Sequence, residues 1–190
     1  YRTPLEYGSQ RTPTAQWTAT AAGAVIVTSQ LRPGPRMARV TIGRVKDKGI
    51  KDANNMGAAM APAAYETLKA HFEDTGLAPD YYDLILTGDL GKLGHEIVTD
   101  LFDRDGVKLN NYNDCGLILF DREEQDVHAG ASGCGCSASV LCGYVLPGLL
   151  AGRWRRILFC PTGALHSPTA TMQGESIPGV CHAIALEGGK

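Results

Sequence analysis

The chain has 190 residues, of which 44% are hydrophobic and 20% are charged, and this composition predicts one soluble globular domain with a buried core. A formal net charge of -2 excludes the wide basic surface that phosphate backbones attract, so we expect no nucleic-acid partner. No apolar run approaches the roughly 18 residues of a membrane-spanning helix, so a membrane role would be peripheral. The six cysteines lie mostly in apolar segments, and we expect reduced thiols in an intracellular protein.

The first quarter of the chain predicts an arm and two strands. Residues 1–20 are rich in Thr, Pro and Gln without a period, which predicts an extended surface arm. Residues 22–30 are apolar and β-branched, and residues 38–46 alternate apolar and polar side chains, so both are predicted strands. The sequence "RPGP" at 32–35 predicts the turn between them.

Two helices and a strand are predicted next. Asn54 and Asn55 are plausible caps for a helix that carries apolar residues at helical spacing and ends at Gly76. Pro62 should kink this helix or mark its first turn. Residues 82–89 predict a buried strand, and residues 95–106 predict a helix with Ile97 and Leu101 on its inner face.

The second half predicts strands around one further helix. Residues 113–120 and 126–130 predict a strand pair, and residues 137–150 predict a helix. Residues 155–164 and 179–187 predict the closing strands. Alternating strands and helices of this size indicate an α/β fold, with helices layered against a mixed sheet in a single domain over 1–190.

The loop "GASGCGCSAS" at 130–139 is the first candidate site. A zinc site is disfavoured because Cys134 and Cys136 form one C-x-C pair with no second pair at comparable spacing. The plainer interpretation is that Gly133 and Gly135 permit close backbone approach while small thiols pack. A functional interpretation also stays open, since a helix N-terminus favours a thiolate or a bound anion.

Two further groups of residues could line a pocket. Asp89, Lys92 and His95 follow a predicted buried strand, where α/β folds commonly bind ligands, although a solvated loop is an equal alternative. His166 and His182 titrate near neutrality and could be ligands or bases, but a histidine among apolar residues is more often a satisfied core group.

Asn113 and Asp114 precede a predicted strand, and such residues usually make a turn. Their place near a strand end keeps a role in the site open.

Five stretches, taken together, carry a specific resemblance: "NMGAAMAPAA", "DYYDLILTGDLG", "NDCGLILF", "GASGCGCSAS" and "TGALHSPT". This combination resembles the family of stage V sporulation protein AD, within the thiolase-like superfamily. The resemblance covers nearly the whole chain. It implies a layered thiolase-like α/β fold, in which this chain supplies one half-repeat and the closing strands of the other.

Members of that family are nearly twice as long, so the resemblance implies that an N-terminal portion is absent from this sequence. The first residue is Tyr1 rather than Met, which indicates a processed chain or part of a longer product. One half of a two-unit fold would expose the face that its twin covers, and we therefore expect self-association.

The resemblance also bears on catalysis. Condensing enzymes of the superfamily carry their nucleophilic Cys in the absent half, and use a His and a further His or Asn in the second half. By motif, this chain has Gly88-Asp89 in place of the first and "GCGC" in place of the second. We therefore expect no catalytic residue, no resident cofactor and no metal.

What the resemblance implies instead is binding of dipicolinic acid and support of its uptake into the developing spore. Backbone amides of the loop from Gly133 to Ser137 could receive one carboxylate, and Lys92, His166 or His182 could receive the other. The implied partners are this ligand and membrane-embedded sporulation proteins. The implied location is inside the forespore or spore, peripheral to the inner membrane.

Two alternatives stay open at this point. The protein could be a degenerate acyltransferase that handles an acyl thioester, or an assembly partner whose surface alone carries the function.

Overall fold

The first long helix shows how local sequence sets the elements. In the computed structural model, which describes residues 12–30 and 32–189, helix α1 spans Met56–Thr75. The Asn55 side chain accepts a hydrogen bond from the amide of Ala58 at 3.2 Å, and Gly76 ends the helix with φ of 65°. The predicted cap and stop are confirmed, and the helix continues through Pro62 without a break.

A five-stranded mixed sheet forms the centre of the fold, in the order β2-β9-β6-β3-β4. Strand β3 is parallel to β4 and β6, whereas β9 is antiparallel to β6 and β2. Two short pairs flank the sheet, β1 with β5 in parallel and β7 with β8 in antiparallel orientation. The strands are β1 (Trp17–Thr18), β2 (Arg36–Thr41), β3 (Leu84–Thr87), β4 (Tyr112–Asp114), β5 (Ala131–Ser132), β6 (Arg156–Cys160), β7 (Thr162–Ala164), β8 (Gly179–Cys181) and β9 (Ala183–Glu187).

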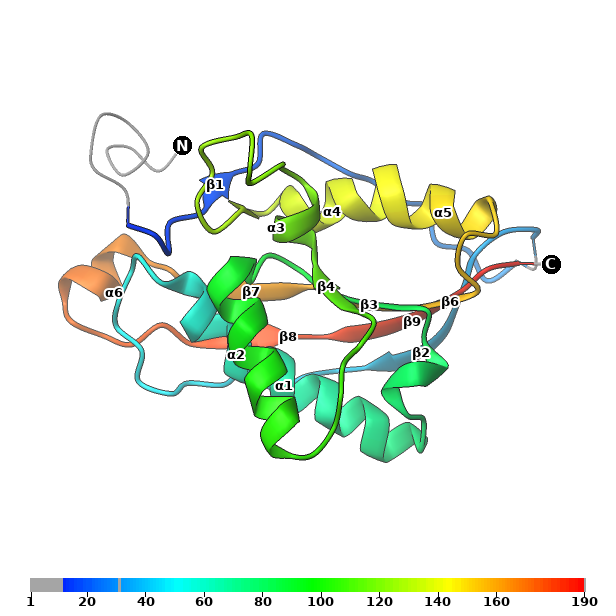
Figure 1. Ribbon diagram of the computed structural model, residues 1–190, viewed down its shortest axis with the longest axis horizontal. Coiled ribbons are helices and arrows are strands. Elements are labelled where there is room, and N and C mark those ends of the chain that lie inside the picture. Colours follow the sequence, from blue (N-terminus) through cyan, green and yellow to red (C-terminus); the bar gives the residue numbers. More distant parts are fainter. Residues whose placement is uncertain (1–11, 31, 190) are drawn as a thin grey trace.

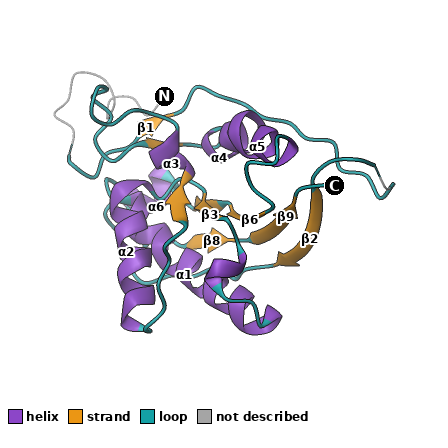
Figure 2. Cartoon of the chain, turned by 45° about the vertical axis from the view of Figure 1, so that its right-hand side comes forward, coloured by secondary structure: helices purple, strands orange, loops and turns teal. Residues whose placement is uncertain are grey.

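Helices cover both faces of the sheet, which confirms the layered α/β prediction (Figures 1 and 2). Beyond α1, the helices are α2 (Gly91–Arg104), α3 (Cys115–Ile118), α4 (Cys136–Val140), α5 (Leu146–Leu150) and α6 (Pro168–Met172), with a 3₁₀ turn at Pro79–Tyr81. Side chains alternate along β6: Leu158 packs in the core under α1 and α2, whereas Ile157 and Phe159 pack in the core under α4 and α5.

The helix predicted over 137–150 is present but is not regular. A π-helical turn at Leu141–Val145 separates α4 from α5, so the helical run extends from Cys136 to Leu150 with one widened turn. The helix predicted over 95–106 begins earlier, at Gly91, and its fully buried side chains are Val98 and Phe102 rather than Ile97 and Leu101.

The strand predicted over 22–30 is wrong. This segment forms no strand, and Val25, Ile26 and Val27 are 50%, 97% and 66% exposed. The cause is pairing: β-branched residues favour extended backbone, but a strand also needs a hydrogen-bonded neighbour, and the described residues place none beside this segment. Residues 1–11 of the predicted arm lie outside the described residues, and Trp17–Thr18 of its remainder pair with β5.

The strand pair predicted over 113–120 and 126–130 is also wrong. The first strand ends at Asp114, whose side chain accepts a hydrogen bond from Gly116 and caps α3. The second segment is a turn, because His128 and Gly130 adopt positive φ of 47° and 105°, which strands do not contain.

The remaining strands occur where the sequence predicts them, with interruptions. The run predicted over 155–164 is split into β6 and β7 at Pro161, which has no amide hydrogen for the ladder. The run over 179–187 is split at His182, and the strand predicted over 38–46 is found as Arg36–Thr41.

A close approach of α1 and α2 provides a test of this packing. A Cβ added at Gly57 would lie 2.5 Å from the Leu90 carbonyl oxygen and 2.9 Å from the Gly94 nitrogen. Gly57→Ala should therefore lower the free energy of unfolding by about 1–3 kcal/mol, measured by urea denaturation.

The matched control is Gly143→Ala, because nothing lies within 4 Å of a Cβ at Gly143. It should leave stability unchanged or raise it by up to about 1 kcal/mol. Equal effects of the two substitutions would contradict the close approach.

Candidate functional site

Three loops meet where β3 and β6 end, and Asp89 joins them. One carboxylate oxygen of Asp89 accepts a hydrogen bond from the amide of Gly133 at 2.9 Å. The other accepts from the Thr162 hydroxyl at 3.2 Å, and that hydroxyl oxygen accepts from the amide of Asp89 at 3.2 Å. Because β3 and β6 are parallel, their carboxyl ends place these loops at the same edge of the sheet.

Asp114 supports this edge from within the core. Its carboxylate is fully buried and accepts hydrogen bonds from the Thr87 hydroxyl at 2.7 Å and from the amides of Leu90, Gly91 and Gly116 at 2.9 to 3.0 Å. Burial raises the pKa of Asp114, while these donors act in the opposite direction. Asp114 therefore fixes both ends of the loop that carries Asp89.

Gln16 joins the first segment of the chain to the same site. Its side-chain nitrogen donates to the carbonyl oxygens of Asp89 at 2.8 Å and Ala131 at 2.9 Å, and the residue is 8% exposed. The neighbouring backbone runs so close that a Cβ at Gly135 would lie 2.0 Å from the Ala21 oxygen. The glycine of the "GCGC" loop is thus required by backbone approach.

The two cysteines of this loop have different surroundings. Cys136 is buried with its sulfur 3.9 Å from the Gly88 oxygen, whereas Cys134 is exposed. Burial, and after it the charges of Asp89 and Asp114, raise the pKa of the Cys136 thiol. Cys136 is therefore a neutral thiol near pH 7, which makes it a weak nucleophile.

Lys92 and Ser137 lie beside this cluster. The Lys92 side chain is exposed at the start of α2, and its amide donates to the Ala129 oxygen at 2.9 Å. Ser137 is half-buried in the first turn of α4.

The histidines are placed differently. His182 is exposed and its Nδ1 accepts a hydrogen bond from the amide of Gly43 at 3.1 Å, while His166 follows β7 and is half-buried. Among the hydrogen bonds between described residues, none joins either histidine to Asp89 or to the 133–137 loop. His95 stacks on Tyr112 with ring centroids 4.4 Å apart.

Sequence reasoning did not find Gln16 or Thr162. Their partners are 73 residues away along the chain, and no local pattern marks such a contact. Asp114 was noted for a turn, and it does cap α3, but its contacts to Thr87 and Leu90 come from the parallel pairing of β3 with β4.

The arrangement binds better than it reacts. Around Asp89, the structure gathers a carboxylate, a hydroxyl and a protonated thiol, and the amide of Gly133 is already used. Within residues 12–30 and 32–189, no group of three or more His, Cys, Asp and Glu side chains could hold a metal ion. In the same residues, no helix has the length and apolar character needed to cross a membrane.

Comparison with known proteins gives a close match in sequence. The family model for stage V sporulation protein AD matches residues 1–187. The stage V sporulation protein AD of Bacillus subtilis (strain 168) is 44% identical over 188 residues, which cover 98% of this chain and 55% of that protein. The chain therefore spans little more than half the length of this relative.

Solved structures with a similar arrangement are condensing enzymes. The tetronic acid condensing enzyme AbyA1 has a TM-score of 0.49 and 15% identity, over 84% of this chain and 49% of the enzyme. The 3-oxoacyl-[acyl-carrier-protein] synthase III from Aquifex aeolicus VF5 has a TM-score of 0.43 and 11% identity, over 84% of this chain and 46% of that enzyme.

The fold and the loop cluster first define the class: a layered α/β protein with its candidate site at the carboxyl ends of parallel strands. Within this class, the chain belongs to the stage V sporulation protein AD family. The family expected from the five sequence stretches is confirmed, and with it a sporulation protein.

The role of Asp114 can be tested by replacing it with the isosteric amide. In Asp114→Asn one acceptor oxygen becomes an NH₂ group, so a buried donor such as the Leu90 amide loses its acceptor. The free energy of unfolding should fall by about 1–3 kcal/mol in thermal or urea denaturation.

Asp100→Asn is the control, because Asp100 is an exposed residue whose ion pair with Arg104 lies on the surface of α2. Its effect should stay within about 0.5 kcal/mol. If the two variants were equally stable, Asp114 would not support the site as described.

Proposed function

We propose that this chain is a non-catalytic sporulation protein that binds dipicolinic acid and supports its uptake into the developing spore. The single observation that carries the non-catalytic part is the neutral, buried thiol of Cys136 in the loop cluster around Asp89. Membership of the stage V sporulation protein AD family supports the choice of ligand.

The geometry narrows where the ligand's carboxylates bind. The amide of Gly133 donates to Asp89, so it does not receive a ligand carboxylate as the sequence predicted. The remaining candidates are the amides in the first turn of the run from Cys136 to Leu150, beside the Ser137 hydroxyl. Lys92, exposed at the start of α2, supplies the cation for the other carboxylate.

Asp89 sets a selectivity condition on this ligand. Its negative charge repels a carboxylate that approaches the loop, so the cation of Lys92 has to offset it. We include His166 and His182 in the site only as residues that a larger ligand could reach.

The proposal also assigns surroundings to the protein. We place it in the forespore or spore, beside membrane-embedded sporulation proteins at the inner membrane. The family name supports the sporulation context.

Titration calorimetry with dipicolinate tests the binding. Dipicolinate should give saturable heat, and Lys92→Ala should weaken the affinity about tenfold because a charge-assisted contact is lost. Lys108→Ala is the matched control, since Lys108 is an exposed lysine that pairs with Asp103 away from the loops. An absence of saturable heat at millimolar dipicolinate would refute the proposal.

The alternative function, acyl transfer, has a separate test. After incubation with an acyl thioester, intact-mass spectrometry should show an unmodified chain, because the buried Cys136 is protonated. An acyl adduct that forms in the unaltered chain and disappears in Cys136→Ser would instead establish a reactive thiol and favour the degenerate acyltransferase.

A further inference from the structure

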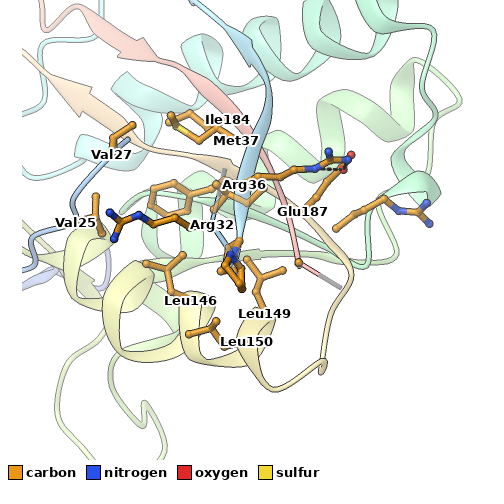
Figure 3. Close-up of a pocket in the computed structure, with 18 of the residues that line it drawn as sticks. Val25, Val27, Arg32, Arg36, Met37, Leu146, Leu149, Leu150, Ile184 and Glu187 are labelled. Atoms are coloured by element: carbon orange, nitrogen blue, oxygen red, sulfur yellow. Dashed lines mark hydrogen bonds and ion pairs between the residues drawn. The ribbon is translucent and has the colours of Figure 1, made fainter. Parts of the chain in front are cut away.

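One face of the sheet is only partly covered. On this face α5 lies over part of the sheet, and a groove of about 1510 Å³ remains between α5, the edge of the sheet and the segment 25–30 (Figure 3). Phe159, Ile184 and Leu186 form its floor.

The walls of the groove are apolar and open to solvent. Leu146, Leu149 and Leu150 line one side, and Leu150 is 67% exposed. Val25 and Ile26 line the other side with even larger exposed fractions for Ile26. Apolar side chains gathered on an open surface at this scale mark an interaction site.

One end of the groove is rich in arginine. Arg32, Arg36, Arg155 and Arg156 line it, next to the start of β6 and the end of β9. Glu187 is the acidic residue among the lining side chains, and it already pairs with Arg36. The end therefore carries a surplus of positive charge.

Arg156 adds an unsatisfied donor at this end. Its guanidinium carbon lies 4.1 Å from the ring centroid of Tyr81, and its Nε is buried without a hydrogen-bond partner among the described residues. Such a donor is rare in a complete structure, so an acceptor from outside the described chain would satisfy it.

We propose that this groove binds an amphipathic helix of a partner protein, with the apolar face of that helix on the floor and its acidic C-terminal turn at the arginines. A helix satisfies its own backbone groups, whereas an extended segment on the face of the sheet would bury unpaired ones. The carbonyl groups at a helix C-terminus carry partial negative charge, which sets the direction of the helix.

The helical run from Cys136 to Leu150 sets the scale of the partner. At 1.5 Å per residue this run is about 22 Å long, and it lies beside the groove, so a partner helix of four turns matches it.

A second copy of this chain fits the groove poorly. The apolar faces of α1 and α2 are already packed in the core, so neither is available to a groove on another copy. Helix α5 has an exposed leucine, but the loop after it carries Arg153 and Arg155, which would meet the arginines of the other copy. The self-association expected from the sequence would therefore bring like charges together.

Fluorescence anisotropy with labelled peptides tests the proposal. The probe is a synthetic helical peptide of roughly 18 residues with leucine along one face and glutamate in its last turn. The comparison peptide has lysine in that turn. The glutamate peptide should bind at least about tenfold more tightly than the lysine peptide, and Arg155→Glu should remove this difference while Arg122→Glu, on an exposed loop, preserves it.

Two leucines with the same exposure provide the matched test of the apolar walls. Leu150→Asp, inside the groove, should weaken the glutamate peptide about tenfold, whereas Leu165→Asp, 66% exposed and outside it, should not. Circular dichroism confirms that each variant is folded.

Three outcomes would overturn the proposal. They are equal binding of the two peptides, equal effects of the two leucine variants, and a dimer in sedimentation that Leu150→Asp dissociates and the glutamate peptide does not. Binding of the unaltered chain to anionic lipid vesicles that displaces the peptide would equally assign the groove to lipid.

Discussion

The buried carboxylate of Asp114 is the constraint on which the functional edge of the sheet depends. It receives four hydrogen bonds, from one side chain of β3, two amides at the start of α2 and one amide of α3. Each of these donors would otherwise be buried without an acceptor. One side chain thus fixes where two strands end and two helices begin, and the loop that carries Asp89 is held between them.

The same arrangement explains why the site is crowded with acidic groups and still stable. Asp114 is compensated by donors from the backbone, and Asp89 by the amide of Gly133 and the hydroxyl of Thr162. The two carboxylates therefore act first as structural acceptors. Their charges also raise the pKa of the Cys136 thiol, so the polar network that builds the site makes this thiol less reactive.

Much of the fold was predictable because the signals were local. The caps of α1, the buried run of β3 and the helix after the "GCGC" loop each depend on residues within a few positions. The segment 22–30 was not predictable, because the choice between strand and exposed coil depends on whether a neighbouring strand exists. For the site, Asp89 and Gly133 were predicted separately, but their hydrogen bond comes from the sheet order, and Gln16 and Thr162 gave no local signal.

The widened turn at Leu141–Val145 decouples the rotational phase of the two ends of one helix. The buried side chains Cys136 and Val140 are four residues apart, and so are Val145 and Leu149, but five residues separate Val140 from Val145. In a regular α-helix, a step of five would turn the second pair away from the sheet, and the π turn absorbs the extra residue. The first turn of the helix is thus oriented by the loop around Asp89 and its last turns by the apolar groove, so sequence change at one end leaves the facing of the other intact.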